Sequence, residues 1–149
     1  MQYELIIIGG GPAGVSAGVY AARKKLKTLF ITESFDNQSI VSPDIHNWIG
    51  TISISGVDLA KSLEAHLRAY ASDSVTIHTG ERVTNIVKTD SGFTVTTPTE
   101  SFETKTVLIA TGSTRRTLDV KGAKEFEHKG LTYCATCDGP VFSGQDVAV

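Results

Sequence analysis

Cysteine is scarce in this chain, and long apolar segments are missing from it. Its 149 residues include only two cysteines, Cys134 and Cys137, and both belong to one CxxC. This count excludes the disulfide framework of a small secreted protein and favours a redox or metal-binding pair in a reducing compartment. No apolar run reaches about 18 residues, and no signal peptide precedes the first strand-like segment. We therefore expect a cytoplasmic protein without a membrane span.

A large excess of charge of either sign is also lacking. The chain has 14 basic and 16 acidic residues, which gives a net charge of −2, and its mean hydropathy is close to zero. This balance does not indicate a nucleic-acid surface, and a hydrophobic content of 40% is typical of a soluble α/β protein. The length permits one domain with a real core.

The first residues predict a nucleotide-binding loop. Glu4–Ile8 is a short apolar run, which is typical of a parallel strand buried on both faces. Glycines at positions 9, 11 and 14 follow in the spacing GxGxxG, and Pro12 suits the first turn of a helix over residues 13–24. Such glycines permit a tight turn, close approach of a pyrophosphate and packing of helix on strand. The helix start offers its N–H groups to a diphosphate.

The segment after this helix supplies the second half of the motif. Lys27–Thr32 predicts a strand, and Glu33 follows it, 19 residues beyond Gly14. A carboxylate in this place accepts hydrogen bonds from ribose hydroxyls and favours an unphosphorylated ribose, as in FAD or NAD. A GxGxxG alone can serve only a tight bend, but here strand, loop, helix, strand and acidic residue occur in order. We therefore predict a dinucleotide site.

A long loop and an amphipathic helix come next. Residues 34–56 are too irregular for a helix and too long for a simple turn, and long loops in compact domains are usually functional. Residues 57–71 restore helical periodicity. The side chains predicted to share its apolar face are Leu59, Leu63, Leu67 and Tyr70.

The following segments predict more strands. Residues 75–78, 82–88 and 93–97 are rich in β-branched side chains and predict a small β-meander inserted into the α/β frame. Residues 101–106 predict a polar strand, and residues 107–110 predict a buried parallel strand. The predicted fold is therefore Rossmann-like, with a parallel sheet and an inserted meander.

Taken together, these segments resemble the low-molecular-weight thioredoxin reductases and the related flavoprotein subunits that reduce peroxiredoxin. Residues 6–14 are similar to the FAD loop of that family, and residues 109–112 are similar to its ATG motif beside the flavin. Residues 130–139, GLTYCATCDG, are the most specific match and resemble a signature of the family. The resemblance spans essentially the whole chain and implies an FAD-binding fold.

The resemblance also implies which residues meet FAD. Glu33 would bind the adenosine ribose, and the backbone of Val83 would meet adenine. Asn47 would approach the flavin, and Gln38 would lie near the cofactor. The residues implied around the pyrophosphate are Gly9, Gly11, Pro12, Ala13 and Gly14, and those implied beside the flavin are Thr111 and Gly112.

The loop that follows Glu33 departs from the family pattern. Asp36 and Asn37 stand where the family has two glycines, and His46 stands where it has a glutamate. Aspartate and asparagine tolerate left-handed backbone conformations, which would preserve the turn. We expect the backbone to approach FAD differently here, and the added carboxylate of Asp36 is unfavourable near a diphosphate unless it points away.

The CxxC predicts an electron relay. A thiolate is the nucleophile in disulfide exchange, a helix start favours it, and the adjacent Asp138 can deliver the proton that a leaving thiol needs. By resemblance, Cys137 is the thiol nearer the flavin, Cys134 exchanges with the protein disulfide, and Asp138 is the general acid. Electrons would pass from NADPH to FAD, then to the Cys134–Cys137 pair. Thioredoxin, a peroxiredoxin-linked dithiol domain or a glutaredoxin-like protein would accept them.

Two other interpretations of the CxxC remain open. In other proteins a CxxC supplies half of the ligands of a four-ligand zinc site. Here no second CxxC exists and the four histidines are scattered, so we name no metal ligand. The CxxC is also compatible with an inert buried pair. The residues Asp138-Gly139-Pro140 are typical of an exposed turn and disfavour that interpretation.

The last segment sets expectations about domains. We expect residues 1–116 to form the N-terminal segment of an FAD-binding domain, and residues 117–149 to form a linker and the start of an NADPH and redox-disulfide domain. Gln145–Val149 predicts the first strand of that second nucleotide domain, so its NADPH site would be absent from this chain.

The expected function is that of a flavoprotein similar to thioredoxin-disulfide reductase, without full turnover by the isolated chain. The alternative is a non-catalytic FAD-binding module or fold fragment. It would self-associate, as a homodimer, to cover an exposed strand edge.

Overall fold

A computed structural model of the chain describes residues 2–113, 116–127 and 129–149. The chain divides into two units, residues 1–112 and residues 113–149. We call them the sheet unit and the C-terminal unit and describe each by itself. In the described part of both units, no helix has the length and apolar character needed to cross a bilayer.

The described part of the sheet unit is built on one six-stranded sheet with the order β3-β2-β1-β6-β5-β4. Its strands are β1 Tyr3–Ile8, β2 Thr28–Thr32, β3 Val75–Thr79, β4 Asn85–Thr89, β5 Gly92–Thr96 and β6 Ser101–Ile109. β1 pairs in parallel with β2 and β6, and β2 pairs in parallel with β3. β4, β5 and β6 form an antiparallel meander. The predicted α/β fold with a parallel sheet and an inserted meander is thus confirmed.

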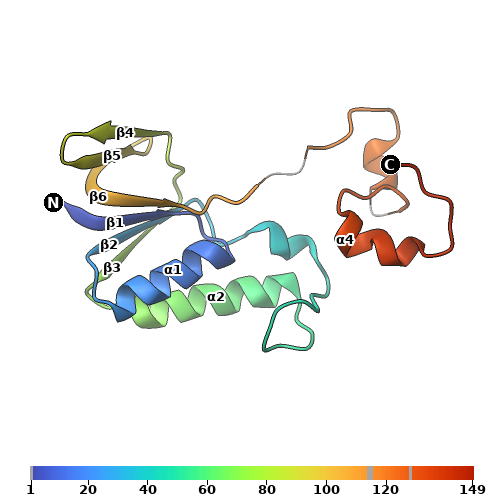
Figure 1. Ribbon diagram of the computed structural model, residues 1–149, viewed down its shortest axis with the longest axis horizontal. Coiled ribbons are helices and arrows are strands. Elements are labelled where there is room, and N and C mark those ends of the chain that lie inside the picture. Colours follow the sequence, from blue (N-terminus) through green and yellow to red (C-terminus); the bar gives the residue numbers. More distant parts are fainter. Residues whose placement is uncertain (1, 114–115, 128) are drawn as a thin grey trace. The chain divides into compact units, whose positions relative to one another are not determined.

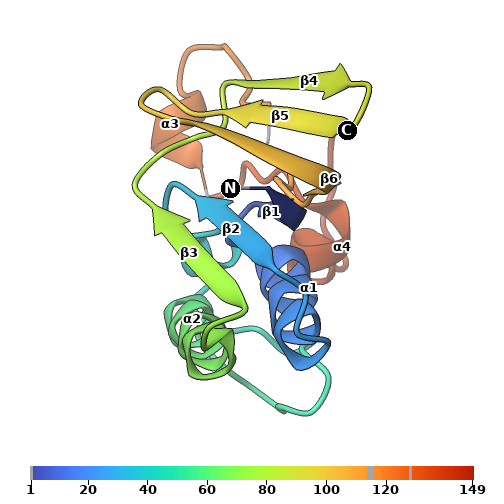
Figure 2. The ribbon, with the colours of Figure 1, turned by 90° about the vertical axis from the view of Figure 1, so that its left-hand side faces the viewer.

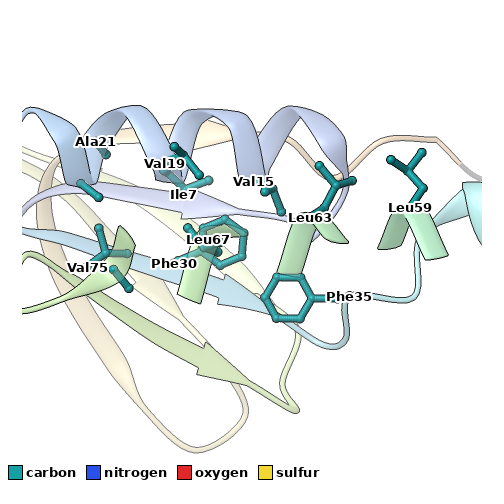
Figure 3. Close-up of a cluster of buried hydrophobic side chains, with 12 residues drawn as sticks. Ile7, Val15, Val19, Ala21, Phe30, Phe35, Leu59, Leu63, Leu67 and Val75 are labelled. Carbon is teal, nitrogen blue, oxygen red and sulfur yellow. The ribbon is translucent and has the colours of Figure 1, made fainter. Parts of the chain in front are cut away.

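Two helices, α1 (Pro12–Arg23) and α2 (Gly56–Ala71), lie side by side on one face of the sheet (Figures 1 and 2). Their apolar faces and the strands beneath them enclose a cluster of buried side chains that includes Phe30, Leu63 and Leu67 (Figure 3). A short 3-10 helix, η1 (Gln38–Val41), lies in the long loop between β2 and α2.

The first strand is buried on both faces, as its apolar run predicts. Ile7 belongs to the cluster under the helices, whereas Ile6 and Ile8 belong to a second cluster with Leu29, Ile31 and Val95. Val95 comes from the meander strand β5. Side chains alternate between the two faces of a strand, so the second cluster lies on the face that the helices leave open. The meander contributes Val95 to the apolar cover of that face.

Residues 75–78 were predicted to belong to the meander, and this prediction was wrong. They belong to β3, which extends the parallel sheet beside β2 instead of opening the meander. A β-branched segment has the same pattern in either place. Its partner is decided by α2, which crosses over the sheet and returns the chain parallel to β2.

Residues 101–109 also differ from the prediction, because they form one strand and not two. The first part of β6 pairs antiparallel with β5, and the later part pairs in parallel with β1. The end of this strand was predicted to be buried, but Leu108 is 38% exposed and Ile109 is 64% exposed. Neither side chain belongs to the two apolar clusters.

The apolar face of α2 differs from the prediction at one position. Leu59, Leu63 and Leu67 are buried, but Tyr70 is 42% exposed and its ring contacts that of His66. Ala71 is buried in the last turn instead. The small alanine side chain meets the core there, so the tyrosine remains at the rim.

The C-terminal unit contains three short helical turns among its described residues: α3 (Ala123–Phe126), α4 (Ala135–Asp138) and η2 (Gly139–Phe142). None of the residues described within 113–149 is buried. The strand predicted for residues 145–149 is not present, because these residues have no secondary structure and pair with no other strand in the described chain.

Candidate functional site

The turn between β1 and α1 requires glycine at two positions. Gly9 has a φ of +121°, and a Cβ atom placed on it would lie 2.2 Å from the carbonyl oxygen of Ala110 in the segment after β6. A Cβ on Gly14 would lie 1.9 Å from the carbonyl oxygen of Gly9. Both contacts are impossible for any other residue, so these glycines allow the helix to start directly against the end of the sheet.

Gly11 differs from these two glycines, because the fold does not require it. Its φ of −80° suits any residue, and a Cβ built on it would meet nothing closer than the Cβ of Asn37, at 3.8 Å. The space above Gly11 is therefore open to a ligand. A glycine in such a place lets a ligand approach the backbone more closely than any side chain would permit.

The start of α1 offers hydrogen-bond donors to that space. In the described chain, the N–H groups of Gly11, Ala13 and Gly14 make no hydrogen bond, and the first helical bond runs from the N–H of Val15 to the carbonyl of Gly11, at 3.0 Å. Pro12 occupies the first helical position, where its missing N–H costs nothing. The first turn contains no acidic side chain. This end of a 12-residue helix is therefore suited to an anion.

Glu33 directly follows β2, the strand beside β1. Its carboxylate accepts a hydrogen bond from Nε of Arg82, and the two side chains form an ion pair. Glu33 is still 54% exposed, so its carboxylate can reach a ligand. Arg82 is a site residue that no local signal in the sequence indicates, because 49 residues separate the two partners.

Val83, next to Arg82, helps to line a cavity of about 310 Å³ in the sheet unit. Thr111 lines the same cavity, so the structure brings these two predicted residues together. The other lining residues are Ile8, Thr84, Asn85, Ile86 and Ile109. Ile8 and Ile109 are the last residues of β1 and β6, which places the cavity at the carboxyl ends of parallel strands. Ligands of open α/β sheets bind at such ends.

The loop after Glu33 keeps its turn without a left-handed residue at the positions that replace glycine. Asn37 is extended, with a φ of −102° and a ψ of 179°, and Asp36 has no positive φ. The side chain of Asn37 accepts a hydrogen bond from the N–H of Ser39 at 2.9 Å and so caps η1. The expected left-handed tolerance is thus not used. Gln38, the first residue of η1, and Asp36 are both exposed.

A polar cluster fixes the part of this loop around Asn47. Asp44 accepts hydrogen bonds from the hydroxyl of Ser53 and from Nε2 of His46, each at 2.6 Å. The bond from Ser53, followed by that from His46, holds the pKa of Asp44 below its usual value. Backbone hydrogen bonds between Ile45 and Ile54 close the loop. Asn47 is exposed on it and adjoins His46, and no hydrogen bond of its side chain is present in the described structure.

The predicted redox residues lie in the C-terminal unit, around α4. Cys134 takes part in a disulfide, and the N–H of Asp138 donates to the carbonyl of Cys134 at 2.9 Å. The side chain of Cys137 lies outside the described part of the structure. The carboxylate of Asp138 accepts a hydrogen bond from the hydroxyl of Thr132, another residue that no sequence motif indicates.

Comparison with known proteins gives one family match along the chain. The profile of the pyridine nucleotide-disulphide oxidoreductases matches residues 3–149. Two curated relatives are a subunit of alkyl hydroperoxide reductase from Staphylococcus epidermidis, 39% identical over 148 residues, and NADH dehydrogenase of Bacillus subtilis, 37% identical over 147 residues. Each alignment covers 99% of this chain. The chain spans only 29% and 28%, respectively, of the length of these relatives.

Solved structures of thioredoxin reductases are similar in fold. The enzyme of Streptococcus pyogenes superposes with a TM-score of 0.82 at 37% identity, over 95% of this chain and 45% of its own. That of T. acidophilum gives a TM-score of 0.73 at 37% identity, over 96% of this chain and 46% of its own. The chain thus spans a little under half of these structures.

Proposed function

The chain belongs to the pyridine nucleotide-disulphide oxidoreductase family, and we propose that it forms the FAD-binding and redox-disulfide portion of a thioredoxin-reductase-like flavoprotein. The observation that carries this proposal is the loop at residues 9–14. Two of its glycines are required by contacts within the fold, whereas Gly11 leaves open space beside N–H groups that have no partner in the described chain. A pyrophosphate fits this combination, because it needs both donors and close backbone approach.

The proposed FAD site extends from this loop in two directions. Glu33 is proposed to accept hydrogen bonds from the adenosine ribose, with Arg82 holding its carboxylate in place. The cavity lined by Val83 and Thr111 is proposed to receive part of the cofactor, with the backbone of Val83 against adenine. The other predicted contacts are Thr111 and Gly112 beside the flavin, Asn47 near the flavin and Gln38 near the cofactor, and these roles stay predictions.

FAD, when bound, supplies two-electron transfer between a reduced nicotinamide, proposed to be NADPH, and the disulfide of this chain. In the reduced chain, the thiolate of Cys134 attacks a disulfide of the partner protein, forms a new S–S bond and displaces one partner sulfur as a thiolate. The thiolate of Cys137 then attacks Cys134, closes the intrachain disulfide and releases the second partner thiolate. The chain loses two electrons, the partner gains them, and the two thiol protons end on the partner's sulfurs.

Asp138 is proposed to carry one of these protons. It lies one helical turn from Cys134, and the hydrogen bond between their backbones fixes that spacing. A carboxyl group so placed takes a proton from a thiol in one direction and returns it to a leaving thiolate in the other. The proposed partner is thioredoxin or a dithiol protein linked to peroxiredoxin. The names of the similar thioredoxin reductases and of the alkyl hydroperoxide reductase support this choice.

A single methyl group can test the cofactor site. In Gly11→Ala the new Cβ meets no atom of the protein closer than 3.8 Å, so the fold should remain within about 1 kcal/mol of the parent. The methyl group fills the proposed pyrophosphate space, and we expect FAD affinity to fall at least about tenfold, or about 1.4 kcal/mol. The measurement is a titration with FAD, followed by visible absorbance after desalting.

A matched variant adds the same methyl group elsewhere. Ser62 is exposed on α2, so Ser62→Thr should bind FAD like the parent chain. If the parent retains no flavin while its circular dichroism shows a folded α/β protein, the proposed cofactor role of this chain is wrong. Equal affinities of Gly11→Ala and Ser62→Thr would instead overturn the assignment of the pyrophosphate to this loop.

A second candidate function is a non-catalytic FAD-binding module that associates with its own copy. The exposure of Leu108 and Ile109 at the end of β6 favours it, since apolar side chains on an uncovered part of a sheet promote association. Two measurements together separate the two candidates. Light scattering at several concentrations gives the oligomeric state of the chain, and a thiol assay follows the exchange of its disulfide. A dimer whose disulfide does not exchange with a dithiol reagent would favour the module.

A further inference from the structure

Thr132 occupies a central position in the redox segment. Its hydroxyl donates a hydrogen bond to the carboxylate of Asp138, six residues further along the chain. The same oxygen accepts a hydrogen bond from the N–H of Cys134 at 3.4 Å. One hydroxyl therefore connects the residue that carries the disulfide with the residue proposed to carry the proton.

A hydroxyl group is suited to both protonation states of its partner. It has one hydrogen to donate and two lone pairs to accept with. When Asp138 is ionised, Thr132 donates to it, as the structure has it. When Asp138 holds a proton, the carboxyl group can donate to Thr132, whose second lone pair still accepts from Cys134. The contact can thus persist through a complete proton transfer, which a purely apolar side chain of the same shape cannot achieve.

The surroundings of Asp138 give this contact importance. Thr132 and Asp138 line a cavity of about 150 Å³ together with Leu131, Val141 and Phe142, and with Gly130. Among these lining residues, Thr132 carries the one polar side chain besides Asp138 itself. None of the residues described within 113–149 is buried, so few apolar contacts hold this segment and its polar contacts contribute more to its order.

We propose that Thr132 is a positioning residue of the redox disulfide, which holds the carboxyl group of Asp138 beside Cys134 in both of its protonation states. This inference rests on the proposed function, in which Asp138 transfers the proton. It assigns to Thr132 no direct contact with the partner or the cofactor. Its predicted effect is therefore confined to the rate of disulfide exchange.

The experiment follows reduction of the chain's own disulfide by dithiothreitol between pH 5 and 9. A thiolate of the reagent attacks one sulfur of the disulfide, the chain's S–S bond breaks, and the leaving thiolate takes a proton. The second reagent thiol then resolves the mixed disulfide and yields oxidised reagent and a reduced chain. Alkylation at timed intervals and mass measurement give the rate without any flavin.

We expect Thr132→Val to slow this reduction by about tenfold, because the carboxyl group of Asp138 is then no longer held beside Cys134. Thr132→Ser keeps the hydroxyl and should stay within about twofold of the parent. Thr117→Val makes the same replacement at an exposed position of the same unit and should have no effect.

A double variant separates positioning from a merely structural role. If Thr132 acts through Asp138, Thr132→Val should slow the parent chain but should not slow Asp138→Asn any further. An equal loss in both backgrounds, or a normal rate in Thr132→Val while Asp138→Asn is slow, would overturn the inference alone. If Asp138→Asn reduces at the parent rate, the acid role in the proposed function fails, and this inference fails with it. Thr132→Ala repeats the test with a smaller side chain.

Discussion

The sheet unit and the C-terminal unit differ in how much of each is removed from solvent. In the sheet unit, two clusters of buried side chains fill both faces of the sheet. Phe30 and Ile7 belong to the cluster drawn in Figure 3, and neither side chain has exposed surface. No described residue of the C-terminal unit is buried, although this unit contains the disulfide. Apolar burial is the main stabilising contribution to folding, so the stability of this chain resides in the sheet unit.

This difference shows that two kinds of order support the two proposed sites. The cofactor loop is fixed by steric contacts, since Gly9 and Gly14 fit only one way against Ala110 and against each other. The redox segment is fixed by hydrogen bonds around Thr132 and Asp138. Segments with few buried apolar contacts open at a lower free energy than core strands. A substitution in one unit should therefore leave the order of the other unchanged.

The largest difference between the two units is expected in the free energy of unfolding, when one phenylalanine of each unit is replaced by alanine. Phe30 is completely buried, so Phe30→Ala should lower the free energy of unfolding by about 3–5 kcal/mol. Phe126 in α3 is 54% exposed, and Phe126→Ala should change it by less than about 0.5 kcal/mol. Urea unfolding followed by the fluorescence of Trp48, which packs against the main cluster, measures both. Equal losses would contradict the assignment of stability to the sheet unit.

A smaller effect is expected at the start of α2. Ser55 is the N-cap of this helix, and its hydroxyl oxygen accepts a hydrogen bond from the N–H of Asp58 at 3.0 Å. Ser55→Ala should destabilise the sheet unit by about 1 kcal/mol, because that N–H loses its partner. Ser62→Ala, on the exposed side of the same helix, should not destabilise it. The exchange rate of the disulfide should be the same in both variants, and a change in Ser55→Ala would show that the units are coupled.

The smallest effect is expected from Glu81, and it depends on pH. Hydrogen bonds from the hydroxyls of Thr97 and Thr99, followed by His78, hold the pKa of Glu81 below its usual value of 4.5. A carboxylate with a lowered pKa stabilises the fold above pH 4.5, and this contribution disappears as the pH falls through the lower, folded-state pKa. Glu81→Gln should therefore be less stable than the parent at pH 7, and the difference should shrink toward pH 3.

Urea midpoints at pH 7, 4.5 and 3 measure this difference. Thr99→Val removes the bond to Glu81 that is 2.6 Å long and should reproduce part of the change. A gap between parent and Glu81→Gln that stays the same at all three pH values would contradict the prediction. The dithiol in the C-terminal unit should react at the parent rate in both variants.

Most of the nucleotide-binding half of the fold was predictable from the sequence, because its signals are local. The apolar run before Gly9, the glycine spacing, the helix over 13–24 and the strand before Glu33 each lie within one stretch of chain. The family resemblance followed from the glycine loop together with residues 109–112 and 130–139, and it is confirmed by the match over residues 3–149. The roles of the individual site residues stay predictions.

The two errors about strands have a common cause, since each concerned a long-range partner. Residues 75–79 pair with β2 because α2 returns the chain there, and residues 101–109 form one strand because two different neighbours flank its two halves. Tyr70 fits the helical period of α2, but only the packing of Ala71 in the last turn decides that it is exposed. Periodicity predicts that a side chain lies on an apolar face, not where the core ends.

The sequence by itself determined the strand, glycine loop and helix at the N-terminus, the family, and the chemistry available in the CxxC and Asp138. The tertiary structure alone decided that Ala110 fills the space beside Gly9, that Arg82 pairs with Glu33, and that Val83 and Thr111 line one cavity. The physical reason is the range of the interactions. Backbone propensity and periodicity act over a few residues, whereas contacts between distant segments depend on how the whole chain packs.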